Sequence, residues 1–247
     1  MSKLIPNIYP SLFKLTHEQI VSGCSKGNCT TSPIALKQLE KEFNSFENID
    51  LSNERHEEEM LSLFPEYLFR ECNEEDWHLF LSMSRFDRKN NTFVAGCFDN
   101  QSLDFHLISY KWRRKNSIKW KTRAGTSPNS TPLIRIHTEE ETIYVVEGHR
   151  DSLTAILLGL DFIMIPYAGF NLREDTSLQH EVKGRELVFL VEDEPAHKCM
   201  IKVANELKAV AESIKLISLG DEDEKVDLSD YVRKHNSIKE VCDGLRN

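Results

Sequence analysis

From Thr142 onward, short apolar runs alternate with segments of helical periodicity. Segments 151–159 and 195–213 repeat apolar residues at helical spacing, which predicts amphipathic helices. The apolar runs are too short for helices and are predicted to be strands, at 142–146, 162–167, 186–191 and 214–219. The order is therefore strand, helix, strand, strand, helix, strand. Strands that are apolar throughout indicate a mostly parallel sheet flanked by helices.

The part of the chain before Thr142 has a different pattern. Residues 16–23 and 32–43 begin with helix start signals and are predicted to be helices. Residues 44–60 are polar and acidic, which indicates an exposed connection or the outer face of a helix. Residues 92–99 and 103–112 alternate apolar and polar side chains around a turn, and we expect a β-hairpin there.

These patterns divide the chain into four parts of an α/β protein. We expect a helical N-terminal region of unknown role at 1–85 and a small β-rich subdomain at 86–141. The mostly parallel sheet with its flanking helices follows at 142–235, and a C-terminal tail follows at 236–247.

Composition narrows the classes of protein that remain. The chain has 247 residues, of which 40% are hydrophobic, and these are sufficient for a substantial core. Its apolar runs are too short to cross a bilayer and no signal peptide precedes them, so we expect a cytoplasmic protein without membrane partners. The six cysteines include no CxxC pair, which favours free thiols, and no zinc is expected.

Charge leaves one local candidate for nucleic-acid binding. The net charge of −9 excludes binding through a general positive field. One segment nevertheless has seven basic residues and no acid, with Trp112 and Trp120 between them: Lys111, Arg113, Arg114, Lys115, Lys119, Lys121 and Arg123. Lysine and arginine contact phosphates and tryptophan stacks on bases. The alternative is a solvated strand face whose tryptophans belong to the core.

Acidic residues follow three of the predicted strands. Glu147 ends the first, and the third is followed by Glu192, Asp193 and Glu194. The last is followed by Asp221, Glu222, Asp223 and Glu224, and then by Asp227 and Asp230. The carboxyl ends of parallel strands meet at one edge, and crowded carboxylates there require a cation, for which Mg²⁺ or Mn²⁺ is suited. The alternatives are a helix cap or a first-turn position for Asp151 and a solvated loop for 221–224.

Three of these segments resemble the motifs of Toprim domains. "VVEGHRDSLTA" is similar to the glutamate motif: an apolar strand, Glu147-Gly148, two residues, Asp151 and a helix. "LVFLVEDEPAHKCMIKVANEL" resembles the second motif, which is usually a strand, Asp-x-Asp and a helix. "VDLSDYV" resembles the segment that ends this module in primases, and "RRKNSIKWKTRAGTSPNSTPLI" resembles the basic stretch that precedes it there. The resemblance covers about Phe93 to His235.

The resemblance to DnaG-type, phage and plasmid primases implies a metal-dependent nucleotidyltransferase. Such an enzyme makes short primers on a single-stranded DNA template from nucleoside triphosphates. The implied catalytic residues are Glu147, Glu192 and Glu194, which with Asp193 would hold two Mg²⁺ or Mn²⁺ ions. Four residues would support them: Gly148, Asp151, Asp227 and Asp230. The implied nucleotide and nucleic-acid contacts are Arg113, Arg114, Lys119, Trp120, Lys121 and Arg123.

The chain also departs from the family pattern. Glu192 and Glu194 stand where aspartates are usual, and His197 replaces a glycine. These changes keep two alternatives open, a Toprim nuclease and a binding module that has lost catalysis. No zinc ribbon or Walker motif occurs, so the resemblance implies a separate helicase or replication initiator as partner, in the replication of a mobile element or phage.

Overall fold

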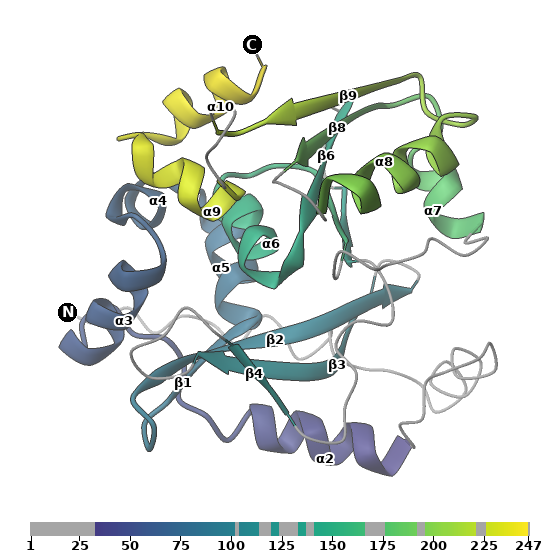
Figure 1. Ribbon diagram of the computed structural model, residues 1–247. Coiled ribbons are helices and arrows are strands. Elements are labelled where there is room, and N and C mark those ends of the chain that lie inside the picture. Colours follow the sequence, from purple (N-terminus) through teal and green to yellow (C-terminus); the bar gives the residue numbers. More distant parts are fainter. Residues whose placement is uncertain are drawn as a thin grey trace.

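The computed structural model contains two β-sheets with helices packed beside and between them (Figure 1). It describes residues 33–101, 104–113, 120–123, 133–136, 141–165, 176–191, 196–220 and 226–246. The protein is a mixed α/β chain with one antiparallel and one mostly parallel sheet, as the hydrophobic pattern predicts.

The first sheet is antiparallel and has four strands in the order β1-β2-β3-β4. They are β1 (Ser84–Asp87), β2 (Thr92–Gln101), β3 (Asp104–Arg113) and β4 (Trp120–Thr122). The long pairing of β2 with β3 confirms the predicted hairpin, and its register shifts between Cys97 and Phe98. Because β4 pairs with β3, part of the basic segment belongs to the sheet itself.

The second sheet has five strands in the order β5-β7-β6-β8-β9. They are β5 (Leu133–Arg135), β6 (Thr142–Glu147), β7 (Phe162–Ile165), β8 (Glu186–Val191) and β9 (Ser213–Ser218). The last four are parallel, which confirms the prediction, while β5 is an antiparallel edge strand. Central β6 buries both of its faces, which explains why its sequence is apolar throughout.

Helices cover the two faces of this sheet. Alternate residues of β6 enter different cores: Ile143 and Val145 pack in the core that contains α8 (Ala196–Leu207), whereas Tyr144 and Val146 pack in the core that contains α6 (Gly148–Leu157). The predicted helix at 195–213 is wrong in length, because α8 ends at Leu207 and the chain turns before β9. Sequence patterns also missed the short helix α7 (Thr176–Glu181).

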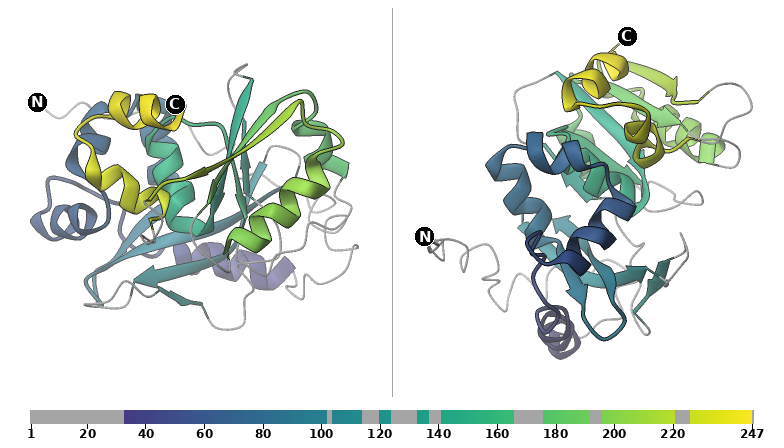
Figure 2. Two further views of the ribbon diagram at one scale, coloured as in Figure 1. Left: turned by 45° about the horizontal axis from the view of Figure 1, so that its top comes forward. Right: turned by 90° about the vertical axis from the view of Figure 1, so that its left-hand side faces the viewer.

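The N-terminal helices are α2 (Pro33–Phe43), α3 (Glu54–Leu63), α4 (Glu66–Glu71) and α5 (Glu74–Ser82). Figure 2 shows α2 on the side of the antiparallel sheet that faces away from the parallel sheet. Helix α2 confirms one prediction, and the other predicted helix, at 16–23, lies outside the described residues. Helix α5 packs on α6 and fills a common core with both sheets. A buried ion pair between Asp76 of α5 and Arg135 of β5 also links α5 to the parallel sheet.

The chain ends in helices rather than in a tail. They are α9 (Leu228–Tyr231), the 3₁₀ turn η1 (Val232–Lys234) and α10 (Ile238–Arg246). The predicted C-terminal tail is wrong, because Val241 and Leu245 of α10 are buried against the N-terminal helices. The Tyr67 hydroxyl of α4 donates to the Val232 carbonyl at 2.7 Å. Within the described ranges, none of the helices is long and apolar enough to span a bilayer.

Candidate functional site

Glu147 is the last residue of the central strand β6, and it lies at the carboxyl end of the parallel sheet. It is partly exposed and occupies the N-cap position of α6, although its side chain makes no capping hydrogen bond. Strands β6 and β8 pair in parallel as far as Val145 and Phe189, and each strand ends two residues later, at Glu147 and Val191. The strand that precedes Glu192 therefore ends at the same edge of the sheet as Glu147. Glu192, Asp193 and Glu194 themselves lie outside the described residues.

Gly148 makes the turn from β6 into α6 possible. Its φ of +80° lies in the region that side-chain-bearing residues avoid. A Cβ atom built on Gly148 would have no neighbour within 4 Å, so backbone conformation rather than crowding favours glycine here. Gly148 therefore allows a tight turn between the end of β6 and the start of α6.

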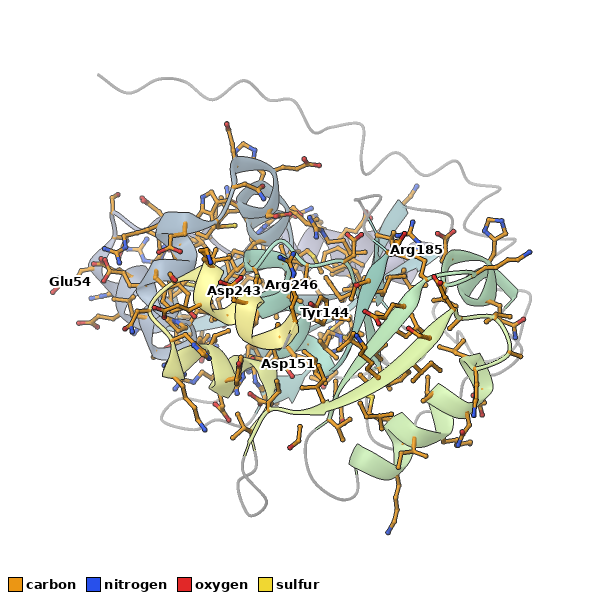
Figure 3. All side chains as sticks on the ribbon, turned by 90° about the horizontal axis from the view of Figure 1, so that it is seen from above. Glu54, Tyr144, Asp151, Arg185, Asp243 and Arg246 are labelled. Atoms are coloured by element: carbon orange, nitrogen blue, oxygen red, sulfur yellow. The ribbon has the colours of Figure 1, made fainter. Side chains whose placement is uncertain are left out.

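Asp151 binds the beginning of α9 rather than capping its own helix. Its carboxylate accepts hydrogen bonds from the Leu228 amide at 3.3 Å, the Ser229 amide at 3.0 Å and the Ser229 hydroxyl at 2.6 Å. Figure 3 marks Asp151 next to the C-terminal segment. Asp151 is not the N-cap of α6, because α6 begins three residues earlier, at Gly148, but it lies in the first turn of that helix, which is the other position that the sequence allowed. These bonds satisfy amides at the first turn of α9 that have no partner within that helix.

Arg150, which the sequence patterns did not single out, binds Asp227, the N-cap residue of α9, and Asp230 within α9. Its Nη2 atom lies 2.7 Å from both carboxylate oxygens of Asp227 and 3.0 Å from Asp230 Oδ1. Burial lowers the pKa of Arg150, but Asp227, Asp151 and Asp230 outweigh burial, and the pKa is raised above its ordinary value. The structure thus supplies a positive group to acids that were expected to face a metal ion. Only spatial proximity reveals this, since Arg150 and Asp227 are 77 positions apart.

His149 connects the same turn to the antiparallel sheet. Lys111 of β3 lies with its Nζ atom 3.3 Å from His149 Nδ1. Burial, and then the Lys111 ammonium, lower the pKa of His149 to about 3, so the imidazole is neutral. Nδ1 then accepts from Lys111 and the ring proton sits on Nε2, which has no hydrogen-bond partner among the described residues.

Acids partner two arginines of the predicted nucleic-acid surface. Arg113 lies 3.5 Å from Glu59 and donates to the Ser62 hydroxyl. Arg123 donates to Glu42 at 2.9 and 3.0 Å. The hydrogen bond to Glu42 raises the pKa of Arg123, and the same bond lowers the pKa of Glu42. Both arginines therefore hold α2 or α3 to the sheet.

The remaining members of the basic segment differ in exposure. Lys121 is exposed, and its Nζ lies 5.3 Å from the centre of the Trp112 ring. Trp120 is partly buried and packs edge-on against Phe93, with 6.0 Å between the ring centres. Arg114 and Lys119 lie outside the described residues. Among the basic residues predicted to bind nucleic acid, Lys121 is thus the described one that is best placed to contact solvent.

A metal site at this edge would combine Glu147 with the acids at 192–194, which lie outside the described residues. Within the described ranges, no group of three histidine, cysteine, aspartate or glutamate side chains could hold a metal ion. Glu147 alone supplies one partly exposed carboxylate at the end of the central strand. Hard divalent cations prefer such oxygen ligands, so the chemistry of Glu147 fits Mg²⁺ or Mn²⁺. Its candidate co-ligands follow the neighbouring strand β8 in the sequence.

Comparison with known proteins identifies the fold but no family. No family model and no curated protein matches the sequence. The chain is similar to the crystal structure of the Aquifex aeolicus primase that comprises its zinc-binding and RNA polymerase domains, with a TM-score of 0.52 and 14% identity. The match covers 88% of this chain and 62% of that chain. The protein has a primase-like fold.

Proposed function

We propose that the protein is a metal-dependent, primase-like nucleotidyltransferase of the Toprim type. It would synthesise short primers on single-stranded DNA from nucleoside triphosphates. The observation that carries this proposal is the place of Glu147, at the carboxyl end of the central strand in a primase-like fold. In open α/β sheets this edge is where ligands bind.

Four acids would hold the metal ions in this proposal: Glu147, Glu192, Asp193 and Glu194. When bound, Mg²⁺ or Mn²⁺ would favour loss of the attacking hydroxyl's proton and stabilise the negative charge that develops on the transferred phosphoryl group. Glu147 would present its carboxylate from the rigid end of β6, and Gly148 would set the direction of the chain behind it. Asp151, Asp227 and Asp230 would act indirectly, by fixing α9 against the first turn of α6.

The template would lie along the basic segment that leaves β3 and returns in β4. Lys121 offers an exposed ammonium for a phosphate contact, and we propose the same role for Arg114 and Lys119. Arg113, Arg123 and Trp120 would contribute mainly by shaping this surface, because each already has a protein partner.

The test is an incubation of the full chain with labelled single-stranded DNA and Mn²⁺, with and without nucleoside triphosphates that carry a second label. The proposal expects new oligonucleotides only when nucleotides are present, and their loss in Glu147→Gln. Shortening of the DNA without nucleotides would instead identify a Toprim nuclease. A melting temperature that millimolar Mn²⁺ leaves unchanged, together with no product, would identify a binding module without catalysis.

A further inference from the structure

The Nη2 atom of Arg150 has the surroundings of a bound cation. Three carboxylate oxygens contact this one nitrogen, two from Asp227 at 2.7 Å and one from Asp230 at 3.0 Å. The Arg150 and Asp227 side chains are only 21% and 25% exposed, so water screens the attraction incompletely. Several carboxylate oxygens around one positive centre is the arrangement that a hard divalent ion selects, and here the positive centre belongs to the protein.

Arg150 and its neighbour Asp151 both bind the start of the short helix α9, and the two side chains have opposite charges. Arg150 binds the acids Asp227 and Asp230, whereas Asp151 binds the amides of Leu228 and Ser229. Asp227 in turn accepts from the Asp230 amide at 2.7 Å, so it is held from both sides. Arg150 and Asp151 both lie in the first turn of α6, two and three residues after Gly148. The turn that presents Glu147 is therefore fixed to α9.

Other charged groups face Arg150 from the elements packed around it. Asp151 lies beside it in α6, and Arg233 of η1 is close enough for Arg150 to lower the Arg233 pKa, second only to burial. Arg233 donates to the Ser62 carbonyl at 2.8 Å, and Asp230 and Asp227 partly offset the lowering of its pKa. Without Arg150, three carboxylates would remain at this place, and the nearby Arg233 already has a hydrogen-bond partner in α3.

We propose that Arg150 is a positioning residue for Glu147 and that it takes the place of a metal ion at Asp227 and Asp230. The inference rests on the proposed function, because it assigns the divalent ions to the Glu147 side of the sheet edge alone. Asp227 and Asp230 are then ionised, and the Arg150 guanidinium, rather than a metal ion, balances their negative charge. Arg150 acts on chemistry only through the orientation of the turn behind Glu147.

Electron paramagnetic resonance of Mn²⁺ counts the ions that the full chain binds and measures their affinity. We expect wild-type protein and the double variant Asp227→Asn with Asp230→Asn to bind the same number of ions. Arg150→Gln should bind about one more, because it releases three oxygens from their cation. The triple variant that combines all three changes should return to the wild-type number. Arg150→Lys, which keeps the positive charge beside these carboxylates, should also bind the wild-type number of ions.

The same titration tests the positioning role. Glu147→Gln should abolish binding of Mn²⁺ at the Glu147 site. Arg150→Gln should lower the Mn²⁺ affinity of that site by about tenfold, because loss of a group that orients a metal ligand has an effect of this size. Arg150→Lys should recover most of that affinity. If the bonds of Arg150 only stabilise the fold, Arg150→Gln would lower the melting temperature but leave both the number of bound ions and their affinity unchanged. That result would overturn the inference.

Two further outcomes separate this inference from the proposed function. Loss of a bound ion in the Asp227 and Asp230 double variant would show that these acids are metal ligands, and it would overturn the role of Arg150 even if primers are made. Conversely, an extra ion in Arg150→Gln that the triple variant loses would support the inference even if the wild type makes no primers.

Discussion

The carboxylate of Asp151 accepts two hydrogen bonds from Ser229, from its amide at 3.0 Å and from its hydroxyl at 2.6 Å. The two residues are 78 positions apart, and both are buried. Asp151 thus holds α9 against the first turn of α6. An acid that the sequence places near a metal site is a structural acceptor here, and Glu147 is the acid of the Glu-Gly-x-x-Asp motif that is partly exposed.

We expect Asp151→Asn to lower the free energy of unfolding by about 2–3 kcal/mol. The amide keeps the size of the side chain, but its NH₂ group would face an amide donor of α9 in place of an acceptor. Urea denaturation measures the change. Asp243→Asn, which alters a carboxylate on α10 that is half exposed, should change the same quantity by less than about 0.5 kcal/mol. Equal losses in the two variants would contradict the role assigned to Asp151.

Gly148→Ala should reduce both stability and primer synthesis. The φ of +80° at Gly148 strains any side-chain-bearing residue, at a cost of about 1–2 kcal/mol. Gly184→Ala is the matched control, because Gly184 has a φ of +71° and equally open space around its Cβ position, and it lies in the turn before the amino end of β8. Both variants should lose similar stability, but only Gly148→Ala should lose activity per folded molecule. Retained activity in Gly148→Ala would contradict the site.

Stability should fall in mild acid because of His149. Burial and Lys111 lower the pKa of His149 to about 3 in the folded protein, whereas an unfolded histidine takes up a proton below pH of about 6.5. The unfolded state therefore binds more protons between these values. This one group removes about 1.4 kcal/mol from the free energy of unfolding for each pH unit below about 6.5, and its effect is constant above that pH.

Urea denaturation at several pH values between 7 and 5 measures this dependence. In His149→Gln, the slope of the free energy of unfolding against pH should be smaller by the contribution of one proton. His180→Gln, whose side chain is 86% exposed, should keep the wild-type slope. Identical slopes in wild type and His149→Gln would contradict a buried neutral imidazole.

Lys121→Ala should weaken binding of single-stranded DNA. An exposed ammonium that contacts one phosphate contributes about one unit to the slope of log K against log salt, so the slope should decrease by about that amount. Arg123→Ala should change the slope less, because Glu42 already partners this arginine. Fluorescence anisotropy over a range of salt concentrations measures both. Equal changes of slope would show that the Arg123–Glu42 pair opens when DNA binds.

The hydrophobic pattern predicts an element well where the element is long enough, and buried enough, to leave a clear pattern in the sequence. The apolar run at 142–146 becomes the central strand β6, since a strand buried on both faces has no polar side. Short elements were missed because they leave no such pattern. The three-residue strand β5 and the six-residue helix α7 carry too few residues to show a period.

The candidate site was predicted in part. The position of Glu147 and the turn at Gly148 follow from one local motif, because a strand, an acid and a glycine are adjacent in the sequence. The partners of Asp151, Asp227 and Arg150 could not be predicted in this way. They come from segments far apart in the chain, and a lone arginine in an acidic motif has no periodic or compositional signal of its own.

The rate of primer synthesis in Glu147→Gln tests the central claim most directly. Glu186→Gln is the matched control, since Glu186 lies at the amino end of the neighbouring strand β8 and binds Lys215 at 2.9 Å. With Mn²⁺, single-stranded DNA and nucleoside triphosphates, we predict that Glu147→Gln loses at least about 100-fold in rate, because a metal ligand is removed, whereas Glu186→Gln keeps the wild-type rate. A Glu147→Gln rate within about twofold of the wild type would contradict the assignment of this sheet edge as the active site.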